Sequence, residues 1–208
     1  MFGITHYETF ILAGIILNIT PGSDTIYILS RSISQGRKAG FFSVLGISSG
    51  IAVHTLLAAL GLSAILAQSA MAFTLVKLAG AIYLGYLGIM TLRAKNSPLL
   101  VTATTATASK DIYLQGLFTN VLNPKVALFF LSLLPQFVDH QNSYGILPFL
   151  LLGLTFIVTG TLWCLGLVYF SSAITRFLRQ NHQASAIMDK VCGAIYLVLG
   201  IKLLSVEQ

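Results

Sequence analysis

The sequence predicts an all-α membrane protein with six transmembrane helices, arranged as two inverted three-helix repeats in which the first and fourth helices are broken. Its 208 residues are 56% hydrophobic and only 9% charged, whereas about 25% of the residues of a soluble domain are charged. Six apolar segments are each long enough for a helix to cross a bilayer, which takes about 20 residues. Prolines interrupt the first and fourth segments at corresponding positions. Lipid is therefore the expected solvent for most of the chain.

The six apolar segments fall within one transmembrane domain, residues 1–208. They are too long and too continuously apolar for barrel strands, so we expect helices, which satisfy their own backbone in lipid. Repeat one covers about 7–92 and repeat two about 113–204. A linker rich in Thr, Ala and Ser, about 93–112, joins them. The predicted spans are Tyr7–Ser30, Ala39–Leu66, Ala70–Leu92, Tyr113–Leu134, Ile146–Phe170 and Ala186–Leu204.

The basic residues predict the orientation in the membrane. Lys and Arg concentrate on the cytoplasmic side of membrane proteins, and three alternate loops carry most of them here, which makes the 93–112 linker cytoplasmic and turns both termini outward. The formal net charge of +6 is accordingly interpreted as a topology signal, and we expect no nucleic-acid partner. The loop residues are Arg31, Arg37 and Lys38, then Arg93, Lys95 and Lys110, then Arg176, Arg179 and Lys190.

An internal repeat supports the division into halves. The third span contains KLAGAIYLGYLGI, residues 77–89, and the sixth contains KVCGAIYLVLGI, residues 190–201. The two segments share a Lys, the run GAIYL and a final LGI. Three crossings per half turn the second half upside down, which is the plan of many secondary transporters, in which paired broken helices meet at the bilayer midplane.

The two proline breaks predict a polar site inside the membrane. Pro21 and Gly22 interrupt the first span, and Pro124 interrupts the fourth. Proline frees backbone carbonyls, which are tolerated at membrane depth only where protein or a water-filled cavity meets them. The helix fragments that begin after the breaks present amide donors and a positive dipole end. We therefore expect one shared cavity, suited to a carboxylate ligand.

Three ionisable residues lie near the middle of their spans: Asp24, His54 and Lys125. An ionised Asp or Lys there costs about 2.5–3.5 kcal/mol on insertion scales. Asp24 is interpreted as a proton carrier or an amine-binding group, with helix capping as the alternative. Lys125 is its counter-charge or a carboxylate anchor, unless it snorkels. For His54, a proton relay and a neutral histidine bonded between helices remain equally open.

Smaller residues complete the predicted site. Asn18, Asn120 and Asn123 lie close to the breaks, where their amides either bind substrate or repair the broken backbone. Gly46 and Gly50 share one helix face with the histidine at 54, since the spacing is four residues. Such glycines allow another helix to approach closely.

The sequence lacks the motifs of several other function classes. It has no P-loop for ATP, no HExxH and no GxSxG, and its two cysteines lack metal-ligand spacing. No nucleophile and base stand out as a pair. We therefore expect no enzyme activity, no cofactor and no metal.

With these residues assembled, the sequence resembles the LysE/RhtB family of bacterial amino-acid exporters over nearly its whole length. The likeness rests on TPGSD in span one, GRKAGFFSVLGISSG leading into span two, KLAGAIYLGYLGI in span three and LFTNVLNPKVALFFLSLLPQFV in span four. Members often carry Pro-Gly-Pro at the first break, where Ser23 replaces the second proline here. The glycine pattern that ends at His54 looks closer to the homoserine and homoserine-lactone exporters than to the lysine exporters.

The resemblance implies a multi-pass protein of the bacterial inner membrane. It implies export of small neutral amino acids or derivatives, of the homoserine, homoserine-lactone, threonine or leucine type, driven by proton antiport. A passive channel for small polar solutes and a non-transporting membrane partner or sensor are the alternatives. The small-residue helix faces serve either internal or intersubunit packing, which leaves a homo-oligomer open.

Overall fold

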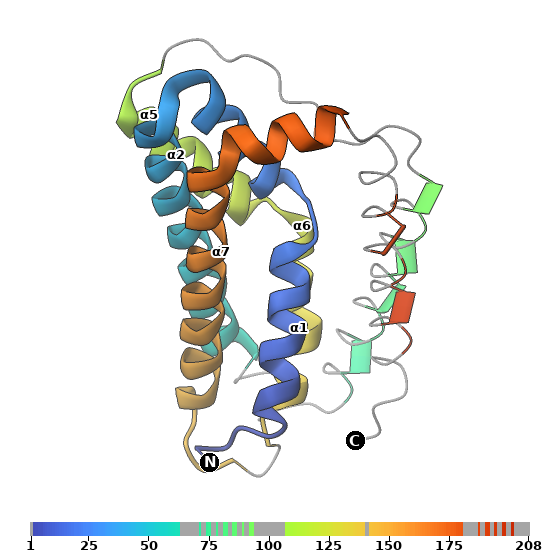
Figure 1. The fold of residues 1–208 in the computed structure, drawn as a ribbon. Coiled ribbons are helices and arrows are strands. Elements are labelled where there is room, and N and C mark those ends of the chain that lie inside the picture. The colour runs from blue at the N-terminus through green and yellow to red at the C-terminus, as the bar shows by residue number, and fades with distance from the viewer. Residues whose placement is uncertain are drawn as a thin grey trace.

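The computed structural model describes residues 2–62, 107–139 and 142–180, together with single helical positions within 71–93 and 187–201. Its described elements are helices (Figure 1). They are α1 (Tyr7–Ile19), α2 (Ser23–Leu57), the π-helical turn η1 (Ala58–Leu62), α5 (Ser109–Val121), α6 (Pro124–Leu128), the π-helical turn η2 (Phe129–Leu133), the 3₁₀ turn η3 (Leu134–Phe137) and α7 (Leu147–Gln180).

The first predicted break is present. Helix α1 ends at Ile19, and the Thr20 amide still bonds to the Ile16 carbonyl. Pro21 has no amide hydrogen to continue this ladder, so the chain passes through Thr20, Pro21 and Gly22 in extended conformation before α2 begins at Ser23.

The predicted boundary between the first two spans is present, but it is shorter than expected. Within α2, from Ser23 to Leu57, two helices meet at a kink at Gly36, where φ is 84° and ψ is 176°, and the residues on either side of it are helical. Only glycine adopts this conformation readily. Arg31, expected in a loop, is instead buried in α2, where its guanidinium donates to Thr107 and Gln115.

The second broken segment begins earlier than predicted. Helix α5 starts at Ser109 rather than at Tyr113, and just before it the Thr107 amide donates to the Gln35 side chain. At Leu122 and Asn123 the chain bends by 46° between Ser109–Val121 and Pro124–Phe137. Both prolines therefore interrupt a helix, as the sequence predicts.

Two described helices are long and apolar enough to cross a membrane, Ser23–Gly61 and Leu147–Ile174. The bent pair α5 and α6 with η2 and η3 is a third if it counts as one span. The predicted third and sixth spans, and with them the repeated segments 77–89 and 190–201, lie outside the described residues apart from single helical positions. The arrangement of six spans in two repeats therefore stays a prediction.

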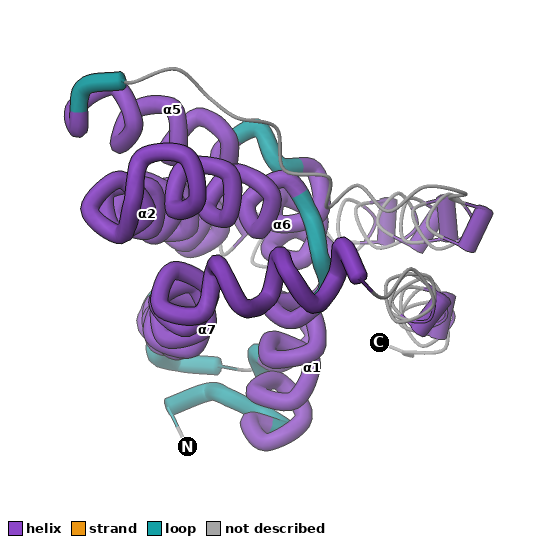
Figure 2. Tube along the Cα trace, turned by 45° about the horizontal axis from the view of Figure 1, so that its top comes forward, coloured by secondary structure: helices purple, strands orange, loops and turns teal. Residues whose placement is uncertain are grey.

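Helix α2 packs against both α5 and α7, and α1 packs against α7 (Figures 1 and 2). Close approach of α2 and α5 depends on glycine. A Cβ atom at Gly46 would overlap the Tyr113 carbonyl, and one at Gly116 would lie 2.9 Å from the Ser43 carbonyl oxygen. Such contacts hold helices together in lipid, where burial of apolar groups contributes little.

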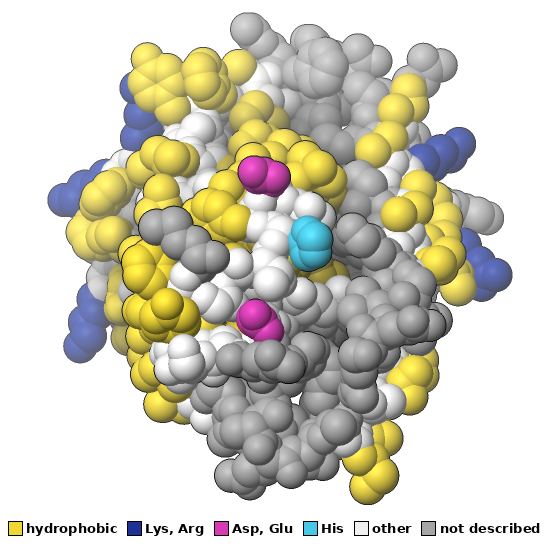
Figure 3. Space-filling model, turned by 90° about the horizontal axis from the view of Figure 1, so that it is seen from below, with side chains coloured by type: hydrophobic (Ala, Val, Ile, Leu, Met, Phe, Trp, Pro, Cys, Tyr) yellow, Lys and Arg dark blue, Asp and Glu magenta, His cyan; other side chains and the backbone are white. Residues whose placement is uncertain are grey.

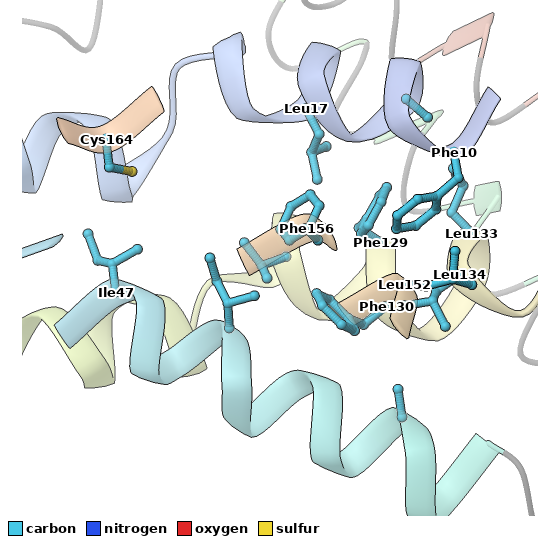
Figure 4. Packing of buried hydrophobic residues seen from close by; sticks show 14 of the residues in the cluster. Phe10, Leu17, Ile47, Phe129, Phe130, Leu133, Leu134, Leu152, Phe156 and Cys164 are labelled. Carbon is cyan, nitrogen blue, oxygen red and sulfur yellow. The ribbon is translucent and has the colours of Figure 1, made fainter. Parts of the chain in front are cut away.

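An aromatic cluster forms the core between α1, α7 and the second broken segment (Figure 4). Phe129 stacks on Phe156 with ring centroids 4.6 Å apart, while Phe10 meets Phe129 at 5.8 Å. The chain just before α1 is attached to the same region, because the Thr5 amide donates to the Phe137 carbonyl. The cluster therefore fills the end of the bundle where α1 begins.

Three basic residues of the described chain lie at the opposite end. Arg37 and Lys38 follow the turn at Gly36, and Lys110 lies in the first turn of α5. Seen from the end where α1 begins, acidic and histidine side chains lie near the centre of the face, and Lys and Arg appear only at its rim (Figure 3). The two ends of the described bundle thus differ in charge. The positive-inside rule uses such a difference to assign the cytoplasmic side.

Candidate functional site

A pocket lies where the two helix breaks meet. Its cavity volume is about 20 Å³, and the open space around it, solvent included, is about 380 Å³. Its position near Gly160 is close to the middle of the span Leu147–Ile174. Its polar and charged lining residues are Asn18, Asp24, Thr25 and Lys125. Its other lining residues are Leu17, Ile47, Ile51, Val126, Phe156, Gly160, Trp163 and Cys164. In Figure 4, Ile47 and Cys164 lie to one side of the aromatic cluster.

The first break leaves a helix start without a side-chain cap. Gly22 occupies the capping position of α2 in extended conformation, with φ at −159°, and no side chain caps this end. Asp24 is the second residue of the helix, so the capping alternative for it is wrong. Its Oδ2 accepts a hydrogen bond of 2.8 Å from the Asn120 side-chain amide. The first-turn amides of α2 therefore remain donors at the pocket wall.

At the second break, a residue of the same segment caps the start of the helix. The Asn123 side chain caps α6, its Oδ1 accepting a 3.0 Å hydrogen bond from the Lys125 amide. Pro124 occupies the first helical position, where a missing amide hydrogen costs nothing. The expectation that this helix end also presents free donors is therefore wrong, and for Asn123 the structure shows backbone repair.

Lys125 reaches across from the second break to the first. Its Nζ donates to the Leu17 carbonyl at 3.1 Å and to the Thr20 carbonyl at 2.8 Å. These are carbonyls at the end of α1, which the helix itself leaves without partners. The snorkelling alternative is therefore wrong. The cation stabilises the negative end of α1 and also places its charge in the pocket wall.

His54 connects to the same network through Asn120, which is fully buried. The His54 Nε2 lies 3.2 Å from the Asn120 carbonyl oxygen, and because a carbonyl only accepts, Nε2 must carry the hydrogen. The imidazole also stacks on Phe130, with centroids 5.8 Å apart. His54 itself does not line the pocket, and one residue, Asn120, separates it from Asp24.

The remaining predicted residues hold neighbouring helices. Asn18 lines the pocket, and its amide lies 3.5 Å from the Thr159 hydroxyl on α7. A Cβ atom at Gly50 would lie 2.7 Å from the Asn120 side chain. Gly50 thereby allows Asn120 to lie between α2 and α5 and to reach Asp24.

The contribution of α7 was missed from the sequence. Gly160, Trp163 and Cys164 lie within a uniformly apolar segment, and spacing alone does not show which face points at the breaks. One signal was available. Trp163 is the single tryptophan of the chain and lies mid-span, whereas membrane tryptophans concentrate at the two interfaces.

Comparisons with known proteins agree with this architecture. The LysE type translocator family matches residues 15–207. An uncharacterized membrane protein of Vibrio cholerae is 31% identical over 93% of this chain and 94% of its own. The homoserine/homoserine lactone efflux protein of Salmonella typhimurium is 30% identical over 96% of both chains. No solved structure matches the chain. A family match over nearly the whole length, together with long apolar helices, shows that the chain is a membrane protein of the LysE type translocator family.

Proposed function

We propose that this protein exports small neutral amino acids or derivatives of the homoserine type across the bacterial inner membrane by proton antiport. The single observation that carries the proposal is the pocket between two broken helices, mid-span, with Asp24 and Lys125 in its wall. A carboxylate and an ammonium are costly at that depth, so their presence beside a cavity indicates a substrate or ion pathway.

The uncapped start of α2 is the proposed carboxylate site. Its amides point from the first turn, the helix dipole favours an anion there, and the Lys125 charge adds to both effects. Lys125 acts through its position rather than as the main donor, because two backbone carbonyls already accept from its ammonium.

Asp24 is the proposed site for the substrate ammonium and for the coupling proton. The substrate ammonium and the proton each neutralise the same carboxylate, so binding of one displaces the other. This mutual exclusion couples export of the substrate to import of a proton. Asn120 holds one carboxylate oxygen at 2.8 Å and keeps the group oriented toward the pocket. One proton moving across 100 mV supplies about 2.3 kcal/mol, which sustains a substrate gradient of roughly 50-fold.

The proposed substrate class, homoserine and its derivatives, follows from the name of the Salmonella relative, a homoserine/homoserine lactone efflux protein. The two compounds share an ammonium group and a side-chain oxygen, but the lactone lacks a free carboxylate. A site for both therefore needs contacts to the ammonium and to that oxygen, with the helix amides used for homoserine or for the ester carbonyl of the lactone.

Exchange between the two membrane faces would need the halves to rock about the pocket. The aromatic cluster lies on the side where α1 begins, which the charge distribution makes the outer side (Figures 3 and 4). We propose that Phe156, which both lines the pocket and stacks on Phe129, moves with α7 when the site opens outward. His54 stays a proposed proton relay, joined to Asp24 through Asn120.

Purified protein in vesicles loaded with homoserine tests this function. We expect efflux that accelerates under an imposed pH gradient and accumulates substrate against its gradient. Asp24→Asn should lower the rate at least 100-fold and abolish the pH response, whereas Asp111→Asn, an exposed carboxylate in the first turn of α5, should retain both. Full rate and pH coupling in Asp24→Asn would remove Asp24 from the mechanism. Efflux that never exceeds equilibration would indicate a channel.

A further inference from the structure

Several buried polar atoms of the described chain have no hydrogen-bond partner, and one of them belongs to a residue that lines the pocket. The indole nitrogen of Trp163 is buried, and no acceptor in the described part of the chain lies within hydrogen-bond distance of it. The same side chain lines the pocket. Buried donors in native proteins nearly always have an acceptor, so each exception calls for an explanation such as a bound molecule.

The location of Trp163 makes the exception more informative. Tryptophan is favoured at membrane interfaces, where its N–H meets water or headgroups, yet Trp163 lies within the apolar span Leu147–Ile174. No acceptor is present among the described residues, and the side chain lines the pocket, so water or another polar molecule that enters the pocket can accept this hydrogen bond.

The space beside Trp163 is bordered by a glycine. Gly160 precedes it by one helical turn, so both face the pocket. A Cβ atom at Gly160 would lie 3.2 Å from Asn18 Oδ1 and 3.6 Å from Ile51 Cδ1. The absence of a side chain there keeps space open between α1, α2 and α7. With Ile47 also in the wall, this side of the pocket is largely apolar, and its polar groups are the Asn18 amide and the indole N–H.

From these observations we propose that Trp163 is the specificity-determining residue of the site. Its N–H donates a hydrogen bond to the side-chain oxygen of the substrate, while Asp24 binds the ammonium at the polar side of the pocket. This inference rests on the proposed function and adds the substrate class: small neutral amino acids with an acceptor oxygen on the side chain, ahead of aliphatic ones. Homoserine carries that oxygen as a hydroxyl, and its lactone carries it as the ring oxygen.

The test compares homoserine with 2-aminobutyrate, which has the same carbon skeleton without the hydroxyl. Each compound competes for efflux of radiolabelled homoserine from vesicles. We expect the wild-type protein to prefer homoserine by about tenfold, since 2-aminobutyrate leaves the buried indole donor without an acceptor. In Trp163→Phe the preference should disappear, to a ratio of about one. Homoserine should bind more weakly, and the binding of 2-aminobutyrate should change little.

Gly160→Ala is the matched control, because it narrows the same side of the pocket and keeps the indole N–H. It should weaken both compounds to a similar extent and retain the tenfold preference. Should Trp163→Phe fold poorly, the single tryptophan can be replaced during biosynthesis by benzothienylalanine. That residue has sulfur in place of the N–H on a ring of nearly the same shape, and the preference should again disappear.

The result that would overturn the proposal is a homoserine preference that survives both replacements, or a wild-type protein that transports the two compounds equally. Tryptophan fluorescence gives an independent readout, because all of the emission comes from residue 163. Emission that does not respond to homoserine in a protein that exports it would also overturn the assignment. Wild-type protein that neither binds nor exports homoserine would refute the proposed function itself, and this inference with it.

Discussion

The two helix breaks look alike in sequence and differ in structure. At the second break, Asn123 caps α6 and Pro124 fills the first helical position, so a residue of the same segment caps this helix start. At the first break, Gly22 offers no cap, and the end of α1 receives its hydrogen bonds from Lys125, a residue of the other break. Asn120, just before the second break, also holds Asp24, just after the first.

This difference suggests that the second break supports the structure and that the first break binds the substrate. The second break has its own helix cap and supplies two polar side chains to the first. The first break keeps an open helix start and a carboxylate at the pocket wall, which are the groups that a zwitterionic ligand needs. We therefore expect changes at the second break to affect stability, and changes at the first to affect substrate binding.

Lys125→Met should have the largest effect on stability. It removes two hydrogen bonds from a charged donor, each worth about 1.5–3 kcal/mol, and leaves the carbonyls at the end of α1 without partners. We expect the free energy of unfolding to fall by about 3 kcal/mol, measured by thermal unfolding in detergent. Lys110→Met, at an exposed position of α5, is the control and should change little. Equal stability of both variants would contradict the supporting role of Lys125.

Gly50→Ala should disturb the link between the breaks. Its Cβ would lie 2.7 Å from the Asn120 side chain, and overpacking of this kind costs about 1–3 kcal/mol. We expect a loss of about 2 kcal/mol, with slower homoserine efflux because Asn120 is displaced from Asp24. Gly166→Ala on α7, where no described atom lies within 4 Å, should be neutral or stabilising. Normal efflux in Gly50→Ala would show that Asn120 is dispensable for orienting Asp24.

Asn123→Ala should reduce stability and spare binding. Loss of a helix cap costs about 1 kcal/mol, and this cap serves α6 alone. Unfolding measurements should show that loss, with KM for homoserine changed less than twofold. Asn123→Ser keeps a capping oxygen and should restore most of the stability. A large rise in KM without loss of stability would place Asn123 in the substrate site instead.

Gly22→Ser should have the smallest and most specific effect. The backbone at Gly22 is extended, so other residues fit, and a serine hydroxyl there would cap the α2 amides. We expect KM for homoserine to rise roughly threefold, as the substrate carboxylate must displace the hydroxyl. Gly22→Ala adds a Cβ that lies 3.3 Å from Lys125 Nζ but brings no acceptor, so its KM should rise less. Equal values for the two variants would argue against the amides as the carboxylate site.

The sequence predicted the parts of the site that break a rule of local structure. Pro21 and Pro124 interrupt apolar segments, and charges at residues 24 and 125 stand out in lipid, so both breaks were identified. The structure places Asp24 and Lys125 in the wall of one pocket, whereas Pro21, Gly22 and Pro124, which were expected to line it, are not among its lining residues. The connection between the first two spans was predicted too long, because the structure makes it with a kink at one residue, Gly36. Arg31 was assigned to a loop from its charge, although its partners, Thr107 and Gln115, lie far away in sequence.

Side-chain contacts between distant elements were out of reach. Lys125 was expected to face Asp24 or a substrate, and nothing local shows that its ammonium extends to the α1 carbonyls. The same holds for Trp163, whose contact with the pocket depends on how α7 rotates against α1 and α2. Local sequence rules describe what one segment can do, whereas such contacts follow from packing between helices.

A structure of the protein with bound homoserine would test most directly whether the substrate carboxylate binds at the first break and not at the second. The account predicts that the substrate carboxylate lies within hydrogen-bond distance of the backbone amides of Ser23, Asp24 or Thr25, with Lys125 still bonded to the Leu17 and Thr20 carbonyls. A carboxylate bound at the start of α6, with Asn123 displaced from its cap, would contradict it.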